Sequence, residues 1–209
     1  MMLETKNMKG KRGIDVSENN GHIDWWAVKE AGIDFAIIRL GYGNCHLDSR
    51  FYANVNGALD AGLEIGVYYY SYALSVEAAK NEANFLVDVL LDCGLPMERL
   101  TMGVYIDMED ADGYKARHGA LDGQLLTGMC GAFLDVCYGR GFDKCGVYSS
   151  YDWLENRLDT FQWGDSTIIW CAQWDEECDW EGAALWQYTD ELEIDGQIFD
   201  GNICMAAEV

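Results

Sequence analysis

Two acidic side chains follow an apolar run in the segment "VYIDMEDAD", residues 104–112. Residues 104–106 are β-branched or aromatic, as in a buried strand, and Asp107 and Glu109 come directly after them. Strand residues two positions apart point to the same side, with Cα atoms about 6.6 Å apart. Both carboxyl groups are therefore expected to face the same substrate.

Such a pair of carboxyl groups could do acid–base chemistry. Two acids held this close do not both stay ionised, and we expect the pKa of the drier one to rise. A protonated acid beside an anion can hydrolyse a glycosidic bond, because the acid protonates the leaving oxygen while the anion stabilises the oxocarbenium-like transition state. The neighbouring Asp110 and Asp112 are instead expected to form a solvated loop. A calcium loop is excluded, because aligning Gly113 with its glycine puts Met108 and Gly119 at ligand positions.

Other carboxylates lie at the ends of apolar runs far away in the sequence. Asp15 ends the run 12–17, and Asp200 opens the run 199–204. In α/β barrels the carboxyl ends of the strands converge on one mouth, where the chemistry is done. The predicted catalytic residues are Asp15, Asp107, Glu109 and Asp200.

Aromatic residues near the predicted strand ends could bind a sugar. The apolar C–H face of a sugar stacks on aromatic rings, and its hydroxyl groups need hydrogen-bond partners. Core packing explains such rings equally well, and we favour it for Tyr68 and Trp186. The predicted substrate-binding rings are Tyr70, Tyr72, Tyr148, Trp170 and Tyr188.

Strand-like and helix-like segments alternate along the chain, which predicts a parallel sheet closed into a barrel. The fold class is expected to be α/β, a TIM-like barrel with eight strands and about five helices, (β/α)5β3. The last gaps are too short for crossover helices. The expected domains are an N-terminal extension, 1–11, and a single catalytic barrel, 12–209. The predicted strands are 12–17, 35–41, 64–72, 102–109, 144–150, 167–174, 183–189 and 199–204, and the helices are 24–32, 49–62, 75–94, 121–141 and 151–158.

Composition restricts the partners. The chain has 14 Lys and Arg against 36 Asp and Glu, a formal charge of −22, so nucleic acid and anionic membrane surfaces would be repelled. A neutral sugar would not be. The eight cysteines form no C-x-x-C pair and the three histidines are not spaced as ligands, so we predict no metal site. The cysteines are expected to be small buried side chains in a reducing compartment, with disulfides left possible.

The N-terminal segment has basic residues but no apolar core, and no run approaches the length of a membrane span. We therefore expect no signal peptide and no membrane insertion, with synthesis in the cytoplasm. A monomer is expected.

Several segments, taken in order, carry a family resemblance. They resemble the family 25 glycoside hydrolases, lysozymes that cleave between N-acetylmuramic acid and N-acetylglucosamine in bacterial peptidoglycan. The resemblance covers about residues 12–204, and its D-x-E pattern is short, so its strength lies in the order of the segments. They are "GIDVSENNGHIDW", "FAIIRLGYG", "GVYYYSYALSVEAAKNEA", "GVYIDMED", "GVYSS", "IIWCAQW", "LWQYT" and "FDGN".

The resemblance implies a barrel of eight strands and five helices, and it implies roles for the acids. Glu109 matches the general acid and base, and Asp107 matches the residue that orients the N-acetyl group for attack on the anomeric carbon. Asp15 and Asp200 match the aspartates of the first and last strands. No metal or other cofactor is implied. A route in which water attacks directly, with inversion, stays open.

The chain departs from the family pattern at two places. Many members end strand two in Lys-Ala-x-Glu-Gly, where this chain has "RLGYG" (39–43), and the usual Leu-Asn after the last aspartate is Gly201 and Asn202. We do not expect Arg39 to be catalytic, and we expect Tyr42 to line the cleft. These departures concern substrate contacts more than the acids.

The resemblance predicts bacterial peptidoglycan as the partner. A chain without a signal peptide resembles phage endolysins, which reach the wall through a separate membrane pore, and non-classical export of a bacterial autolysin is the alternative. Two other functions stay open: a carbohydrate-binding pseudoenzyme without turnover, and a barrel hydrolase that uses a divalent metal.

Overall fold

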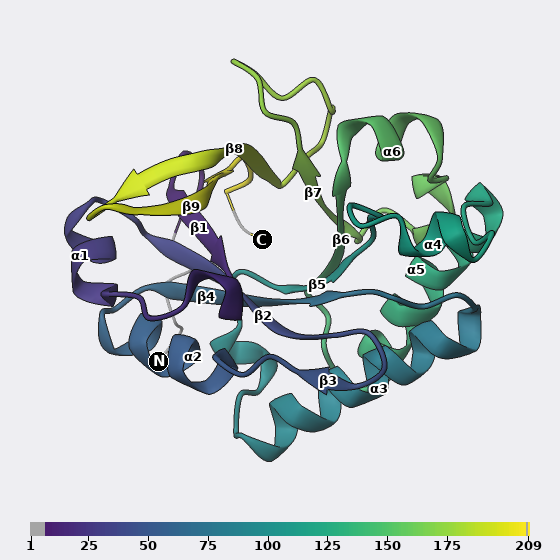
Figure 1. Cartoon of the computed structure of the whole chain (residues 1–209), viewed down its shortest axis with the longest axis horizontal. Coiled ribbons are helices and arrows are strands. Elements are labelled where there is room, and N and C mark those ends of the chain that lie inside the picture. The colour runs from purple at the N-terminus through teal and green to yellow at the C-terminus, as the bar shows by residue number, and fades with distance from the viewer. Residues whose placement is uncertain (1–6, 208) are drawn as a thin grey trace.

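A closed barrel of eight strands forms the centre of the protein. The computed structural model describes residues 7–207 and 209. The sheet order is β1-β9-β8-β7-β6-β5-β4-β2-β3, and pairing of β1 with β2 closes the ring, with the two-residue β3 attached at the edge of β2. The predicted barrel is thus confirmed (Figure 1). The strands are β1 (Arg12–Val16), β2 (Phe35–Tyr42), β3 (His46–Leu47), β4 (Glu64–Tyr70), β5 (Val104–Asp107), β6 (Cys145–Ser150), β7 (Ile168–Ala172), β8 (Leu185–Ile194) and β9 (Gln197–Cys204).

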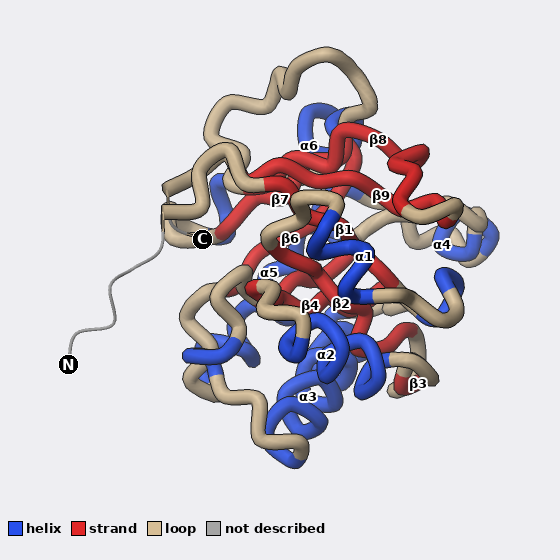
Figure 2. The backbone as a smooth tube through the Cα atoms, turned by 90° about the vertical axis from the view of Figure 1, so that its left-hand side faces the viewer, coloured by secondary structure: helices blue, strands red, loops and turns tan. Residues whose placement is uncertain are grey.

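Helices cover part of the barrel wall. The five predicted helices are present, and the short α4 after the acidic segment was not predicted. In Figure 2 the strands gather at the centre, with α2 and α3 on one side of them. The α-helices are α1 (Trp25–Glu30), α2 (Phe51–Asp60), α3 (Val76–Asp92), α4 (Tyr114–Arg117), α5 (Gly123–Gly139) and α6 (Tyr151–Asn156), and the 3₁₀ helices are η1 (Glu18–Asn20), η2 (Met97–Arg99) and η3 (Thr160–Trp163).

The sequence explains where the longest helix beside the site begins and how it packs. Ser75 caps α3, because its hydroxyl accepts a hydrogen bond from the Ala78 amide. The predicted apolar stripe of this helix is fully buried against the barrel. Its members are Ala79, Ala83, Leu86 and Leu90.

The last strand runs against its neighbours. β9 is antiparallel to both β8 and β1, whereas the other barrel pairs are parallel. A two-residue turn, Asp195 and Gly196, joins β8 to β9, and both residues have positive φ angles of 50° and 76°. This is the Asp-Gly hairpin turn, which needs no crossover helix. The short last gap, which was expected to hold no crossover helix, is this hairpin, and it makes β9 the antiparallel strand of an otherwise parallel barrel.

The barrel interior is packed with large rings, and glycines make room for them. Tyr68, Tyr105 and Trp170 fill the interior, with ring centroids 6.0 Å and 5.3 Å from Trp170. A Cβ on Gly146 would lie 2.1 Å from the Ile168 carbonyl oxygen and 2.8 Å from the Tyr105 ring. The barrel interior is therefore filled with side chains, which form a closed floor beneath the mouth.

Both described chain ends lie at the bottom of the barrel. The Met8 amide donates to the Ala207 carbonyl over 2.9 Å, and the Gly10 amide donates to Cys204 over 2.7 Å. The side chains of Met8 and Val209 are buried in the interior cluster. Part of the predicted N-terminal extension thus packs on the barrel floor.

The eight cysteines are free thiols. Five of them are buried, including Cys130 and Cys137 on the inner face of α5. Cys45 and Cys93 are exposed, so the expectation of small buried side chains does not hold for these two.

We expect Gly146→Ala to destabilise the protein by about 1–3 kcal/mol, because the added methyl group would overpack the barrel interior. Urea denaturation measures this loss. Gly139→Ala is the matched control: its Cβ, at the end of α5, meets nothing within 4 Å, so it should be neutral or stabilise by about 0.5 kcal/mol. Equal stabilities of the two variants would contradict the packed floor.

Candidate active site

Two of the four predicted acids face each other across neighbouring strands. Asp15 of β1 pairs in register with Asp200 of β9, and their carboxyl groups are within hydrogen-bonding reach. Oδ2 of Asp15 accepts hydrogen bonds from the Gln187 amide nitrogen over 2.9 Å and from Asn202 over 2.7 Å. Asp15 is only 6% exposed. These two side-chain amides therefore hold its orientation.

The other two acids form a second pair at the end of β5. The strand ends at Asp107, but the Met108 amide still donates to the Tyr148 carbonyl over 2.9 Å, so the chain stays extended. The Met108 side chain is buried on the outer face of the barrel wall. Asp107 and Glu109 therefore share the inner side, and their carboxyl groups are within hydrogen-bonding reach.

Burial raises the pKa of all four acids. For Asp15 and Asp107 the pKa rises well above the ordinary value, because of burial first and the neighbouring carboxylate second. The pKa of Glu109 is also raised by burial, and that of Asp200 rises to about 6. Each pair can lower its repulsion by sharing one proton between its two carboxyl groups.

The drier member of the second pair is Asp107. It is 4% exposed, whereas Glu109 is partly exposed. Oδ1 of Asp107 is buried without a hydrogen-bond partner among the described residues. Burial therefore favours the protonated form more strongly at Asp107 than at Glu109.

A cavity of about 450 Å³ opens in front of Glu109. Tyr148, Ser150, Ala172 and Trp174 line its other sides. Trp174 is 60% exposed, so its ring is free to stack on a ligand.

One side-chain amide connects the two sides of the mouth. The Gln187 oxygen accepts hydrogen bonds from the Tyr148 hydroxyl and from the Trp174 indole, each over 3.1 Å, while its nitrogen donates to Asp15. The rings that line the cavity are thus fixed relative to the acids of β1 and β9.

The predicted aromatic residues at the mouth have different positions. Tyr70 and Tyr72 are partly exposed, with ring centroids 5.0 Å apart, and Tyr72 donates to Asp112 over 2.9 Å. Tyr42 is also partly exposed, with the Arg39 guanidinium 4.8 Å from its ring centroid. These three rings have surface available for a ligand at the edge of the mouth.

Two of the predicted rings are placed differently from expectation. Trp170 is 1% exposed and donates to Asn202 over 2.8 Å, so it supports Tyr148 from below and offers no stacking surface. Tyr188 lies against the position where a Cβ of Gly201 would point, on the face of β9 opposite Asp200. The expectation of a direct sugar contact is therefore wrong for Trp170, whereas the partly exposed Tyr188 lies on the side of β9 away from Asp200.

Asp110 and Asp112 do not form a merely solvated loop. The Asp110 carboxylate accepts hydrogen bonds from the amides of Lys115 and Ala116 over 2.6 Å and 3.0 Å. Asp112 accepts from the amide of Tyr114 over 2.9 Å. The two acids thus fix the start of α4 directly after Asp107 and Glu109.

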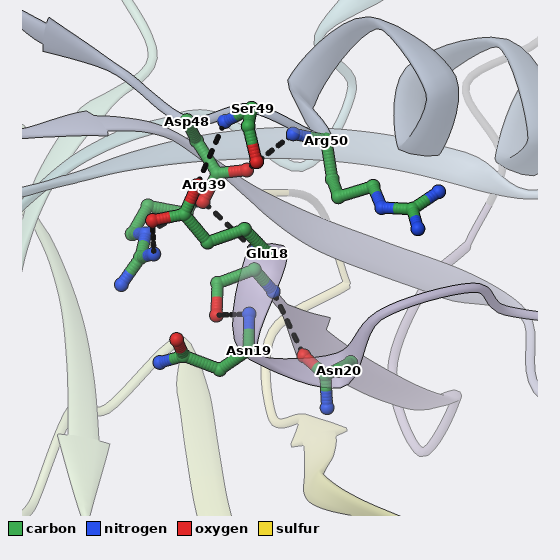
Figure 3. Close-up of polar contacts among 8 residues, drawn as sticks. Glu18, Asn19, Asn20, Arg39, Asp48, Ser49 and Arg50 are labelled. Carbon is green, nitrogen blue, oxygen red and sulfur yellow. Dashed lines mark hydrogen bonds and ion pairs between the residues drawn. The ribbon is translucent and has the colours of Figure 1, made fainter.

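Arg39 is held by ion pairs on the other side of the mouth (Figure 3). Its Nε donates to buried Asp48 over 2.8 Å, and its Nη2 donates to Glu18 over 3.2 Å. Glu18 also accepts from the Ser49 amide over 2.9 Å, and Ser17 caps the short helix that carries Glu18. This network holds the loop after β1 against the end of β2.

A family model matches most of the chain. The model of glycosyl hydrolases family 25 matches residues 14–197. The chain belongs to glycosyl hydrolases family 25.

Two curated proteins that are similar to this chain in sequence are lysozymes. The autolytic lysozyme of Clostridium acetobutylicum is 27% identical over 169 residues, 78% of this chain and 45% of that protein. Lysozyme M1 of Streptomyces globisporus is 44% identical over 62 residues, 30% of this chain and 21% of that protein. The chain thus spans less than half the length of these curated relatives.

Solved structures share the fold. The modular autolysin LytC of Streptococcus pneumoniae, solved with a synthetic peptidoglycan ligand, superposes with a TM-score of 0.81 at 25% identity, over 93% of this chain and 46% of that one. A family 25 glycosyl hydrolase of Bacillus anthracis gives 0.76 at 17% identity, over 98% and 91%. The barrel fold is therefore common to all three.

Several residues of this family 25 site were not among the predicted site residues. Gln187 and Asn202 lie two positions after Leu185 and Asp200, which face the barrel interior. The alternation of side chains along a strand could therefore have predicted that both amides point inward. Trp174 lies just after β7, beyond the last paired residue. Lys115 gave no signal, because its position depends on how the loop after β5 folds.

No group of three or more His, Cys, Asp or Glu among the residues that the structure describes is arranged to hold a metal ion. No helix formed by these residues has the length and apolar character needed to cross a membrane.

We expect Asp107→Asn to stabilise the protein at pH 8. Because the folded-state pKa of Asp107 is raised, the folded protein binds more protons than the unfolded chain between the two pKa values, and stability falls as the pH rises through that interval. A neutral amide removes this cost, which is about 1.4 kcal/mol for each unit by which folding raises the pKa of Asp107. Thermal melting at pH 4 and pH 8 measures the gain.

The gain in melting temperature should be largest at pH 8 and shrink toward pH 4. Asp60→Asn, at an exposed position on α2, is the control and should show no pH-dependent gain. A variant at position 107 that is less stable than wild type at pH 8 would contradict the raised pKa.

Proposed function

We propose that this protein is a muramidase that hydrolyses the β-1,4 bond between N-acetylmuramic acid and N-acetylglucosamine in bacterial peptidoglycan. The observation that carries the proposal is the carboxyl pair of Asp107 and Glu109 in a family 25 chain, with Glu109 lining a cavity of about 450 Å³. The proposal is supported by the names of the relatives, which are lysozymes and autolysins.

In the proposed mechanism, Glu109 is the general acid and then the general base. It is the member of its pair that lines the cavity, so it can reach a glycosidic oxygen bound there. Asp107 orients the substrate N-acetyl group, whose carbonyl oxygen attacks the anomeric carbon as the leaving group takes the proton. Water then opens the cyclic intermediate, with Glu109 accepting its proton.

Substrate binding can place the shared proton where it is needed. In the free site Asp107 is drier and holds the proton more strongly than Glu109. An acetamido N–H that donates to Asp107 stabilises its anionic form, so the proton moves across the hydrogen bond to Glu109. Glu109 therefore becomes the protonated acid only when the N-acetyl group is bound.

Asp15 and Asp200 complete the proposed site on the opposite side of the mouth. Their pair carries negative charge close to the acids of β5, and Asp15 raises the pKa of Asp107. Negative charge beside the sugar ring stabilises the positive charge that develops at the anomeric carbon. Tyr148 and Trp174 are proposed to hold the sugar in the cavity.

The cell wall is the proposed place of action, supported by the similarity to the autolytic lysozyme of Clostridium acetobutylicum and to the autolysin LytC. Export through a phage-type pore or by a non-classical route remains part of this proposal. The 12–209 catalytic unit is proposed to act as a monomer.

We expect Glu109→Gln to lower the hydrolysis rate by at least about 10²-fold, because general acid catalysis contributes 10²–10⁴-fold. The measurement is the release of new reducing ends from purified peptidoglycan, with and without a chelator. Glu98→Gln, an exposed acid in η2 before β5, is the matched control and should keep full activity. A wild-type protein that binds peptidoglycan and releases no reducing ends on several wall types would instead be a carbohydrate-binding pseudoenzyme.

Asp107→Asn should reduce the rate about as much as Glu109→Gln if the N-acetyl group is the nucleophile. An amide there lacks the negative charge that aligns and activates this group. The anomeric configuration of the first product, followed by NMR, separates retention through the N-acetyl group from inversion by direct attack of water. A small loss with an inverted product would overturn the assisted route.

A further inference from the structure

A buried ammonium group lies directly behind the carboxyl pair of β5. Lys115 on α4 is 1% exposed. Its Nζ donates a hydrogen bond to the Glu109 carbonyl oxygen over 2.9 Å and another to the carbonyl oxygen of Ser71. Ser71 follows β4, and its own amide donates to the Asp107 carbonyl over 3.0 Å. Lys115 therefore joins the ends of two neighbouring strands at the catalytic mouth.

The ammonium has no directly paired carboxylate. In the part of the chain that the structure describes, Lys115 takes part in none of the ion pairs within 4.0 Å. Burial of an unpaired charge is costly, and a neutral donor would bind two carbonyl oxygens without that cost. A purely structural role does not explain why a cation stands here.

Charged and titratable groups surround Lys115 from every element packed against it. Burial lowers its pKa, and the nearby carboxylates oppose this effect. The positive charge in turn lowers the pKa of Asp107, Glu109 and Glu82. The surrounding groups are Glu82 on α3, Asp107 on β5, Glu109 and Asp110 in the following loop, Cys130 on α5, and the rings of Tyr70 and Tyr72, whose centroids lie 6.0 Å from Nζ.

We propose that Lys115 is a positioning residue of the catalytic pair, whose buried ammonium group fixes the backbone of Glu109 and keeps the pair of Asp107 and Glu109 at one proton rather than two. This inference rests on the proposed function. Lys115 does not touch the substrate and acts only through the two acids.

Two physical effects follow from this arrangement. The hydrogen bond to the Glu109 carbonyl sets where this side chain leaves the backbone, and a displacement of 1 Å at an acid catalyst is costly to the rate. The positive charge favours ionisation of the pair, so one carboxylate is available at lower pH than four crowded acids would otherwise allow. Removal of the charge should therefore shift the titration of the pair to higher pH.

Three substitutions separate charge from hydrogen bonding. Lys115→Gln is neutral but keeps a donor, Lys115→Met is neutral without a donor, and Lys115→Arg keeps the charge. For the two neutral variants we expect both limbs of the pH profile of kcat/KM to move upward by about one pH unit. Their kcat should fall about 10-fold or more, with KM changed less than about 3-fold. Lys115→Arg should keep the wild-type pH profile.

Lys80→Met is the matched control, because it removes one positive charge from an exposed position on α3. Its pH profile should coincide with that of wild type. Neutral variants at position 115 that lose activity equally at every pH, with both limbs unmoved, would overturn the proposal and leave Lys115 a structural role only.

A direct titration tests the same inference without any substrate. Carbon-13 NMR of the side-chain carboxyl groups of Asp107 and Glu109 should show midpoints at higher pH in Lys115→Gln than in wild type. In wild type, nitrogen-15 NMR of Lys115 should show an ammonium group throughout the pH range in which the pair titrates. A neutral amine there would overturn the proposal even if no variant at this position folds.

The two proposals fail in distinguishable ways. If wild type does not hydrolyse peptidoglycan but the carboxyl midpoints still shift, the proposed function fails and the electrostatic role of Lys115 stands. If hydrolysis is observed and the midpoints of the folded neutral variants do not move, the role of Lys115 fails alone.

Discussion

The crowding of four carboxyl groups in a dry barrel mouth is the constraint on which the rest of the site depends. Four full negative charges at this spacing would repel strongly, and burial makes each of them more costly. Pairing the acids relieves this cost, because each pair can share a proton. The amides of Gln187 and Asn202 and the ammonium of Lys115 stabilise the charge that remains.

The supporting residues explain why the acids keep their geometry. Asp110 and Asp112 fix the start of α4, and α4 places Lys115 behind Glu109. On the opposite side of the mouth, Gln187 links the cavity rings to Asp15. The acids at the end of β5 therefore have two roles. Asp107 and Glu109 form the carboxyl pair on the inner side of the barrel, and Asp110 and Asp112 fix the helix α4 that carries Lys115.

Much of the fold could be predicted from the sequence because its signals are local. The buried β-branched runs, the Ser75 cap and the apolar stripe of α3 depend on residues close together in the chain. The Asp195-Gly196 turn, which sets the direction of β9, is also a local signal, and the direction of this strand was not predicted. For the site, the same local rule placed Asp107 and Glu109 on the inner side of the barrel, because strand residues two positions apart point to the same side.

The parts that could not be predicted depend on contacts between distant segments. Whether a ring at a strand end faces a cavity or the barrel floor depends on the neighbouring strands, which is why Trp170 and Tyr188 were misplaced. The drier acid could not be identified, because burial of Asp107 is decided by the packing of β4 and β6 beside it. Lys115 depends on the folding of a whole loop.

The position of the chain ends has a consequence for how the barrel could be joined to other parts. The backbones of Met8 and Ala207 are hydrogen-bonded to each other beneath the interior cluster, at the end of the barrel opposite the acids. A polypeptide attached at either point would therefore start on the side of the barrel away from the mouth. Because Met8 and Ala207 lie side by side, two segments attached there would start next to each other, and a polymeric substrate could still reach the acids at the opposite end of the barrel.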